Sequence, residues 1–348
     1  MAELNHVSYE KISSNFNKYK LTEADYRLFK KTDWIVTEKI HGANFCLISN
    51  GVRVDFAKRK ETLSSKDDFF GYQIIAEQLK IKALAIFEAV KSINSRVEQI
   101  SIYGELFGGE YPHPKIEANP NVKAIQTGVY YSPNIEFMAF DIAYIEEGQE
   151  RNYLDCDRFI DICESADLLY IPILFRGKYE EAVAYKTEFT TTIPKVLGLP
   201  LLDIENLAEG IVIKPAHNFF IETSKGKLRP VLKLKISQFA EDKRFHQAQK
   251  WNYNNYESVE QSDLTSDRLE AEALNLVTLN RFNNLISKIG KPIKKNKKQR
   301  NYILQLYVKD VIEDLEENLD IVVAELETSD REKLIDAIEQ QAKKLIAN

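Results

Sequence analysis

Hydrophobic and polar positions over the first 240 residues change repeatedly between strand-like and helix-like periods. Apolar β-prone runs occupy 34–37 and 45–49, and residues 52–57 alternate as a strand with one buried face does. Asn50-Gly51 separates the last two runs and is typical of a tight hairpin. Further strands are predicted at 100–103, 135–143, 211–213 and 231–236, and helices at 69–90, 157–168 and 179–186. This mixture predicts an α/β (α+β) fold.

The pattern changes near residue 241. Residues 241–267 are polar and aromatic without a clear period, and every later segment repeats apolar residues at helical spacing. The three apolar stripes are Leu269, Ala273, Leu276, Val277, Phe282, Leu285, Ile286 and Ile289; Leu304, Tyr307, Val308, Val311 and Leu315; and Leu334, Ile338, Ala342 and Leu345. We therefore predict one domain over 1–243, a linker at 244–268 and an all-helical C-terminal domain over 269–348.

Composition narrows the class of protein. The 348 residues are 44% hydrophobic and 29% charged, a globular balance that argues against wholesale disorder. No apolar run approaches the roughly 18 residues of a membrane helix, and the N-terminus lacks a secretory pattern. Three cysteines are too few for a disulfide framework, so we expect a reducing, cytoplasmic compartment. The net charge of -6 argues against a uniformly basic surface but allows a local basic groove.

Candidate chemistry begins at Lys39, in the run Glu38-Lys39-Ile40-His41-Gly42-Ala43-Asn44-Phe45. A lysine amine that has lost its proton can attack a phosphate, and a nearby glycine lets the backbone approach that phosphate closely. Lys-x-x-Gly alone is not specific, because Lys195-Val-Leu-Gly198 matches it too. That second match lies between prolines without a strand around it, so we favour Lys39. Taken alone, Lys39 also fits an ordinary solvated strand lysine beside a turn.

Further pieces of suitable chemistry follow in order, each at a predicted strand edge. Lys58-Arg59-Lys60 places three cations where a strand ends, a composition suited to phosphate or ribose. Glu105 lies in a glycine-rich turn and is suited to a ribose hydroxyl, and Phe140 is suited to stacking on a base. Each of these also fits a structural role, as a turn or a core aromatic.

Two more pieces lie near the end of the predicted α/β domain. Glu209 precedes an apolar strand that ends in Lys214. Lys233 and Lys235 alternate with leucines, so both project from one face of a strand. Adjacent lysines repel unless they share an anion, which favours a phosphate there, although a solvated edge strand would look the same. The ordered set is harder to explain structurally than any one piece.

The ordered motifs resemble those of the covalent nucleotidyltransferase superfamily of polynucleotide ligases and messenger RNA capping enzymes. Four stretches are more narrowly similar to the phage RNA ligase 2 family, which includes the trypanosome RNA-editing ligases. They are residues 38–45, Asp-Phe-Phe-Gly-Tyr at 68–72, the turn at 176–178 and Leu-Asn-Arg-Phe-Asn-Asn-Leu-Ile-Ser-Lys-Ile-Gly at 279–290. The resemblance spans nearly the whole chain. It implies a nucleotidyltransferase (ATP-grasp-like) domain of antiparallel sheets and helices, followed by a C-terminal all-helical domain.

The resemblance implies an ATP-dependent RNA ligase that seals 3′-hydroxyl and 5′-phosphate ends, at nicks in duplex RNA. In the implied sequence Lys39 takes AMP from ATP, the AMP moves to an RNA 5′-phosphate, and an RNA 3′-hydroxyl then displaces it. Implied further catalytic residues are Glu209, Lys233 and Lys235. Implied ATP-binding residues are Glu38, Ile40, Arg59, Glu105, Phe140, Glu209, Lys233 and Lys235.

The same resemblance implies RNA and metal contacts. The RNA-binding candidates are His41, Asn44, Arg59, Asp141, Lys214, Arg281 and Asp310. The cofactor ion is Mg²⁺ or Mn²⁺, with Glu209 and Asn44 as candidate ligands. Residues 291–300 hold six cations that would suit an RNA backbone, but such a run more often forms a solvated helix connection.

Two alternatives stay open at the level of sequence. A GTP-dependent capping-type guanylyltransferase would share the lysine chemistry, but such enzymes carry a β-barrel where this chain shows helical patterns. A non-catalytic RNA-end-binding protein would not need the complete set of lysines and carboxylates found here. We expect a monomer, because no coiled-coil or other assembly signal is present.

Overall fold

The computed structural model describes residues 4–64, 67–223, 226–236, 269–270, 273–274, 276–278, 281–282, 285, 297–319, 323 and 326–347. The chain divides into two compact units, Met1–Tyr256 and Glu257–Asn348. Their boundary falls within the predicted linker. The linker residues 244–268 and the basic residues 291–296 lie outside the described residues, so what was expected of them stays a prediction.

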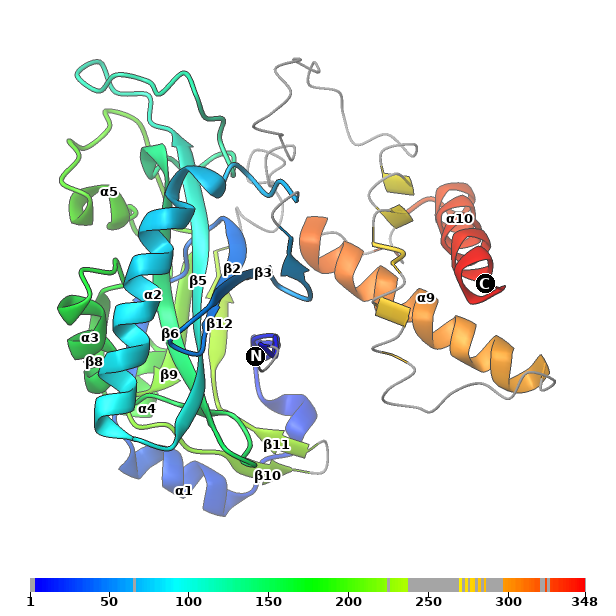
Figure 1. Ribbon diagram of the computed structural model, residues 1–348, viewed down its shortest axis with the longest axis horizontal. Coiled ribbons are helices and arrows are strands. Elements are labelled where there is room, and N and C mark those ends of the chain that lie inside the picture. The colour runs from blue at the N-terminus through cyan, green and yellow to red at the C-terminus, as the bar shows by residue number, and fades with distance from the viewer. Residues whose placement is uncertain are drawn as a thin grey trace. The chain divides into compact units, whose positions relative to one another are not determined.

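Two antiparallel sheets form the first unit (Figure 1). The four-stranded sheet has the order β12 (Leu232–Lys235), β9 (Gly210–Pro215), β1 (Trp34–Glu38), β8 (Ile173–Gly177). The six-stranded sheet has the order β4 (Thr62–Leu63), β3 (Val54–Lys58), β2 (Ala43–Ser49), β5 (Val97–Glu110), β6 (Ser132–Glu146), β7 (Asn152–Tyr153). β10 (Ile221–Thr223) and β11 (Gly226–Leu228) form a separate hairpin.

Helices cover the sheets of the first unit. α2 (Gln73–Ile93) runs along the six-stranded sheet and buries the apolar stripe that its sequence predicts, including Leu79, Ile86 and Val90 (Figure 1). The other helical segments are η1 (Asn17–Tyr19), α1 (Glu23–Lys31), α3 (Cys156–Ser165), α4 (Tyr179–Val183) and α5 (Ile193–Val196). The mixed fold of antiparallel sheets and helices that we predicted is therefore confirmed.

Local sequence explains where several elements begin and end. The predicted hairpin forms with Gly51 at φ +84°, and Ser49 pairs with Val54 across it. The helix predicted from residue 69 begins only at Gln73, because Phe70 and Gly71 both have positive φ and form a turn first. The helix α1 was not predicted, since it buries only Phe29 and so has too narrow an apolar stripe.

The second unit contains two long helices, α9 (Lys297–Leu319) and α10 (Thr328–Ala347). The described members of all three predicted apolar stripes, from Leu269 to Ala342, pack into one core. The all-helical pattern is therefore confirmed over the described residues. Ile286, Ile289 and the side chain of Leu345 lie outside them, so their part of the prediction stays untested. Within the described part of the chain, we find no helix whose length and hydropathy would let it cross a membrane.

Candidate active site

Strand pairing brings Lys39 and Glu209 together. Lys39 follows β1 directly, and its backbone N–H donates to the carbonyl oxygen of Gly210 at 2.9 Å. Because β1 and β9 are antiparallel neighbours, the end of β1 meets the start of β9, and Glu209 comes to lie beside Lys39. β12 pairs with the other edge of β9 and places Lys235 opposite Gly210. Three predicted residues that are far apart in sequence thus meet at one edge of the sheet.

One buried carboxylate organises this edge. Lys39 Nζ donates to Glu209 Oε2 at 2.6 Å, Lys235 Nζ lies 3.2 Å from Glu209 Oε1, and His41 Nδ1 lies 3.7 Å from Oε2. Burial raises the pKa of Glu209, but Lys39, His41 and Lys235 outweigh it and lower that pKa to about 2. Glu209 is therefore ionised at neutral pH and holds two lysine ammonium groups that remain partly open to solvent.

Two glycines make the close approach possible. A Cβ on Gly42 would lie 2.4 Å from the carbonyl oxygen of Leu106 and 3.0 Å from Cγ of Glu105, so the Lys-x-x-Gly glycine lets the Lys39 segment touch β5. A Cβ on Gly210 would lie 2.0 Å from the carbonyl oxygen of Leu234, and Gly210 has φ +149°. The sequence motif is thus explained by packing against β5 as well as by access to a phosphate.

Glu105 lies inside β5, so the glycine-rich turn predicted there is wrong: the backbone pairing of β5 continues through its glycines. Glu105 pairs with Asn44 across β5 and β2, and directly opposite side chains in such a pair lie on the same face. Burial has the largest effect on the pKa of Glu105 and raises it. The positive charges of Lys39 and Arg59 lower this pKa and the negative charge of Glu209 raises it, which leaves it at about 8. Glu105 therefore lies within electrostatic reach of Lys39, Glu209 and Arg59, and it can retain a proton near neutral pH.

Phe140 lies at an irregularity in β6. Tyr103 pairs with Asp141 and Gly104 with Ala139, so Phe140 is the extra residue of a β-bulge. A bulge turns a side chain away from the regular alternation, and the half-buried ring of Phe140 packs edge-on against Tyr9 at 5.0 Å between centroids. The expected role in base stacking stays a prediction.

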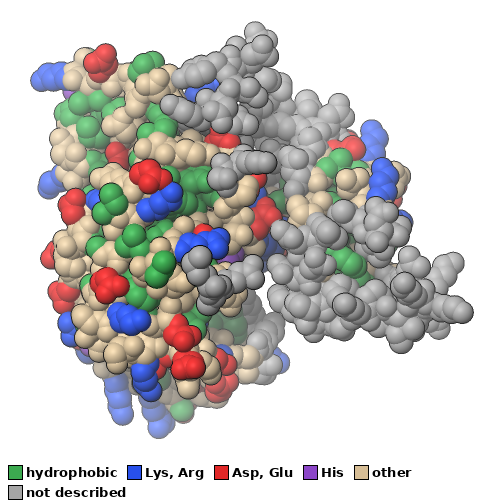
Figure 2. All heavy atoms as spheres, in the orientation of Figure 1, with side chains coloured by type: hydrophobic (Ala, Val, Ile, Leu, Met, Phe, Trp, Pro, Cys, Tyr) green, Lys and Arg blue, Asp and Glu red, His purple; other side chains and the backbone are tan. Residues whose placement is uncertain are grey.

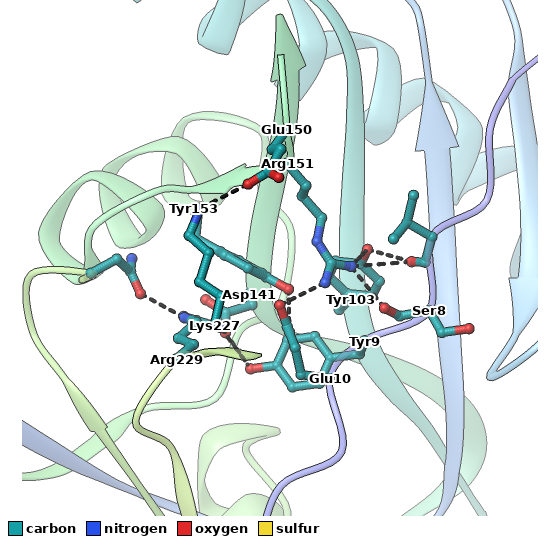
Figure 3. A network of polar contacts seen from close by, with 12 residues as sticks. Ser8, Tyr9, Glu10, Tyr103, Asp141, Glu150, Arg151, Tyr153, Lys227 and Arg229 are labelled. Atoms are coloured by element: carbon teal, nitrogen blue, oxygen red, sulfur yellow. Dashed lines mark hydrogen bonds and ion pairs between the residues drawn. The ribbon is translucent and has the colours of Figure 1, made fainter. Parts of the chain in front are cut away.

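The structure places Asp141 and Lys214 in a buried network and not on a surface. Figure 3 shows the part of this network around Asp141, Tyr9 and Arg229. Asp141 accepts hydrogen bonds from Tyr9 (2.6 Å) and Arg229 (2.8 Å), and Lys214 Nζ lies 3.1 Å from its other oxygen. Lys214 also donates to the carbonyl oxygen of Phe140 at 2.6 Å. Burial raises the pKa of Asp141, but Arg229 and Lys214 lower it to about 2. This arrangement offers no support for the expected RNA contacts of these two residues.

The remaining candidates of the first unit flank the site. Lys233 is half-buried on β12, and its backbone N–H donates to the carbonyl oxygen of Ser13 at 3.1 Å. Glu38 is fully buried and Ile40 is part of an apolar cluster, so neither side chain is open to a ligand. Their predicted contact with ATP can come only from the backbone in this arrangement.

Arg281 and Asp310 are brought together in the second unit. Arg281 Nη1 donates to the backbone oxygen and the carboxylate of Asp310, at 2.9 and 2.8 Å, and Nη2 donates to Asp314. The Arg281 side chain is largely buried, whereas Asp310 is more open. The arginine thus links α9 to the segment that precedes it, and its expected contact with RNA stays a prediction.

Charged side chains of both signs are spread over the first unit, and they form no metal-binding group by themselves among the described residues. On the face of the first unit seen in Figure 2, acidic and basic side chains alternate, as the net charge of -6 would suggest. Among the described residues, no group of three or more His, Cys, Asp and Glu side chains could hold a metal ion by itself. Asn44, Glu105 and Glu209 offer oxygen atoms, which suit Mg²⁺ or Mn²⁺ when substrate phosphates supply the other ligands.

Sequence reasoning missed five residues that hold the candidate residues in place: Tyr131, Thr191 and Thr192 beside the Lys39 segment, and Tyr9 and Arg229 around Asp141. None of the five lies in a motif. Each forms a hydrogen bond to the side chain or the backbone of a residue that is between 88 and 220 positions away in the sequence. The one available signal was the pair Thr191 and Thr192 shortly before Pro194, since threonines at the start of a helix often form hydrogen bonds with nearby groups.

The fold and the cluster of Lys39, Glu209 and Lys235 fit a nucleotidyltransferase. A model of the RNA ligase family matches residues 32–235, and a model of the T4 RNA ligase 2 C-terminal domain matches residues 259–344. The chain therefore belongs to the RNA ligase family. This confirms the predicted enzyme class, an RNA ligase.

Individual relatives agree with the family assignment. The mitochondrial RNA-editing ligase 1 of Trypanosoma brucei brucei is 30% identical in an alignment that covers 90% of this chain and 76% of the relative. RNA-editing ligase 2 of the same organism is 32% identical in an alignment that covers 81% of this chain and 76% of the relative. A solved structure of a Naegleria gruberi RNA ligase mutant with ATP and Mn matches with a TM-score of 0.41 and 15% identity, over 68% of this chain and 57% of that one.

Proposed function

We propose that this RNA ligase seals nicks in duplex RNA, through a lysyl-AMP and an adenylylated RNA intermediate. The observation that carries the proposal is the contact of Lys39 with Glu209, with Lys235 on the other oxygen of the same carboxylate. A lone lysine beside a carboxylate would be an ordinary ion pair. A second lysine on the same carboxylate provides a cation that can neutralise the phosphate while Lys39 attacks its phosphorus.

In the first step, the Lys39 amine loses its proton to solvent and its nitrogen forms a bond to the α-phosphorus of ATP. The bond from that phosphorus to the bridging oxygen breaks, and pyrophosphate leaves with the electron pair. Glu209 holds Nζ in position before the attack, and Lys235 neutralises the α-phosphate. A divalent ion held by Glu209 and the phosphate oxygens would supply further charge neutralisation.

In the second step, an oxygen of the RNA 5′-phosphate attacks the same phosphorus and the bond to Lys39 breaks. In the third, the RNA 3′-hydroxyl loses its proton to solvent, its oxygen bonds to the phosphorus of the 5′-phosphate, and the bond from that phosphorus to the bridging oxygen breaks so that AMP leaves with the electron pair. Each step exchanges one bond to phosphorus for another, so positioning and charge neutralisation supply most of the catalysis. Glu105, with a pKa of about 8, can donate a hydrogen bond as well as accept one, which suits a ribose hydroxyl.

The proposal is tested with an RNA duplex that carries one nick with 3′-hydroxyl and 5′-phosphate ends. We expect joined product with ATP and Mg²⁺ or Mn²⁺, a trace of adenylylated RNA, and less product from the same strands without the complement. The Lys39→Ala variant should give none. Lys195→Ala is the matched control, since Lys195 occupies the other Lys-x-x-Gly sequence and is exposed. Equal joining of unpaired strands would contradict the nick preference, and product with GTP alone would contradict the use of ATP.

A further inference from the structure

The residue that precedes the nucleophile carries a carboxylate that is completely buried. Glu38 accepts hydrogen bonds from the Thr191 hydroxyl, from the Thr192 backbone N–H at 2.8 Å and from the Thr192 hydroxyl at 2.7 Å. A buried carboxylate without partners is costly, and three donors meet that cost here. Because the carboxylate is fully used by these donors, its effect is to fix the end of β1, from which Lys39 extends.

The peptide that follows the nucleophile is fixed from the other side. The backbone N–H of His41 donates to the hydroxyl oxygen of Tyr131 at 3.0 Å. Tyr131 is fully buried and packs edge-on against Phe107, so its hydroxyl has little freedom to move. Lys39 is thus held between one support that acts on Glu38 and one that acts on His41.

Asn206 links the two supports by hydrogen bonds to Tyr130 and to Thr191. The Asn206 side chain accepts from the backbone N–H of Tyr130 (2.9 Å) and donates to its carbonyl oxygen (2.7 Å). The Asn206 backbone oxygen accepts from the N–H of Thr191 at 2.9 Å. Three residues further on, the same segment supplies Glu209, which contacts Lys39. The segment 189–209 therefore fixes the backbone around Lys39 and also supplies its carboxylate partner, Glu209.

We propose that Thr191, Thr192 and Tyr131 are positioning residues for the attack of Lys39 on the nucleotide. The proposal rests on the lysyl-AMP step described above. A lysine side chain has many rotamers, and attack requires its nitrogen about 3–3.5 Å from the phosphorus and in line with the leaving group. A displacement of about 1 Å can reduce the rate about 100-fold, so supports that never touch ATP still set the rate of the step.

The first test uses two double variants that separate shape from hydrogen bonding. Thr191→Val with Thr192→Val keeps the shape and removes both hydroxyls, and Thr191→Ser with Thr192→Ser keeps both hydroxyls. The rate of lysyl-AMP formation is measured at saturating ATP, together with the ATP concentration that gives half the maximal rate. We expect the valine pair to be about 10- to 100-fold slower with little change in that concentration, and the serine pair to stay close to the unaltered protein.

The second test applies if the valine pair does not fold. Tyr131→Phe removes only the oxygen that accepts from His41, and should slow lysyl-AMP formation at saturating ATP without a matching rise in the ATP requirement. An unaltered rate in folded Tyr131→Phe or in the folded valine pair would overturn the proposal, and so would a serine pair as slow as the valine pair. If the unaltered protein forms no lysyl-AMP, the proposed function itself fails, and this outcome is distinct from the others.

Discussion

Strand β9 connects two clusters of the same charge composition, each with one carboxylate and two lysine or arginine side chains. At its start, Glu209 contacts Lys39 and Lys235. The Glu209 side chain is 2% exposed, but those of Lys39 and Lys235 are 21% and 26% exposed. The carboxylate is enclosed and its cations reach solvent, so an anionic ligand can approach them.

Near the end of β9, Asp141 contacts Lys214 and Arg229. Here all three side chains are enclosed, with exposures of 2%, 8% and 1%, and the Tyr9 hydroxyl donates a further hydrogen bond (Figure 3). The pKa is lowered to about 2 in both carboxylates, so ionisation does not distinguish them. What distinguishes a reactive cluster from a structural one in this protein is the access of its cations to a ligand.

The largest expected effect is on catalysis, through Lys39→Ala. Strand joining should fall by at least about 10³-fold, because no other group replaces the nucleophile. Glu209 keeps Lys235 and His41 as partners, so the midpoint of chemical unfolding should change little. The two measurements are a ligation rate on nicked duplex RNA and a denaturant titration. Loss of folding together with joining would show that the Lys39 cluster is structural as well.

The next effect is on stability, through Asp141→Asn. Two enclosed cations would lose their counter-charge, and the free energy of unfolding should fall by about 3–5 kcal/mol in a denaturant titration. Asp55→Asn is the matched control, because Asp55 pairs with the exposed Arg53 and its loss should cost about 1 kcal/mol or less. Similar costs in both variants would contradict the structural role of the Asp141 network.

The contrast between the two clusters also shows what sequence reasoning could reach. The order of Lys39, Glu105, Glu209 and Lys235 along the chain was sufficient to suggest the family resemblance, and that resemblance implied one common site for them. The residues alone did not predict which strands pair to bring Lys39, Glu209 and Lys235 together. The enclosure of Asp141 depends on Tyr9 and Arg229, which are 132 and 88 positions away, and no local pattern reports such contacts.

The ends of strands and helices also depend on contacts that a local sequence pattern does not report. β5 extends from Val97 to Glu110, well beyond the predicted 100–103, because its glycines interrupt the apolar pattern while the backbone pairing with β6 continues. β8 was missed altogether, since none of its side chains is fully buried. Local periodicity found the cores of the elements, and pairing with distant strands set their ends.

A smaller effect concerns pH, through Glu105. Its pKa rises from 4.5 to about 8 on folding, so the folded protein keeps a proton that the unfolded chain loses. Stability from this group is therefore complete below about pH 4.5 and is lost as the pH rises through about 8. Glu209 and Asp141 have the opposite sign, since their contributions are lost as the pH falls from about 4 toward about 2.

The measurement is a series of denaturant titrations between about pH 4.5 and about pH 8, on the unaltered protein and on Glu105→Gln. The variant should show a flatter dependence of stability on pH, because glutamine has no proton to lose. An identical dependence in both proteins would mean that Glu105 is not held in its neutral form.

The smallest effect is expected at the surface, through Arg176→Ala. Arg176 makes a two-pronged contact with Asp157, but both side chains are well exposed. The loss should change the free energy of unfolding by about 0–1 kcal/mol in a denaturant titration, because solvent screens exposed pairs. A loss of stability as large as that of Asp141→Asn would show that the exposure of an ion pair does not determine how much it contributes to stability, and would contradict the contrast drawn between the two clusters.

The most direct measurement is the mass of the intact protein after incubation with ATP and a divalent ion, followed by mapping of the modified peptide. We expect the mass to increase by one AMP on Lys39, and added pyrophosphate to reverse the increase. The Lys39→Ala variant should show no increase. Protein that is already adenylylated should first lose AMP to pyrophosphate and then regain it from ATP. AMP on another residue, or no covalent AMP under any of these conditions, would contradict the account.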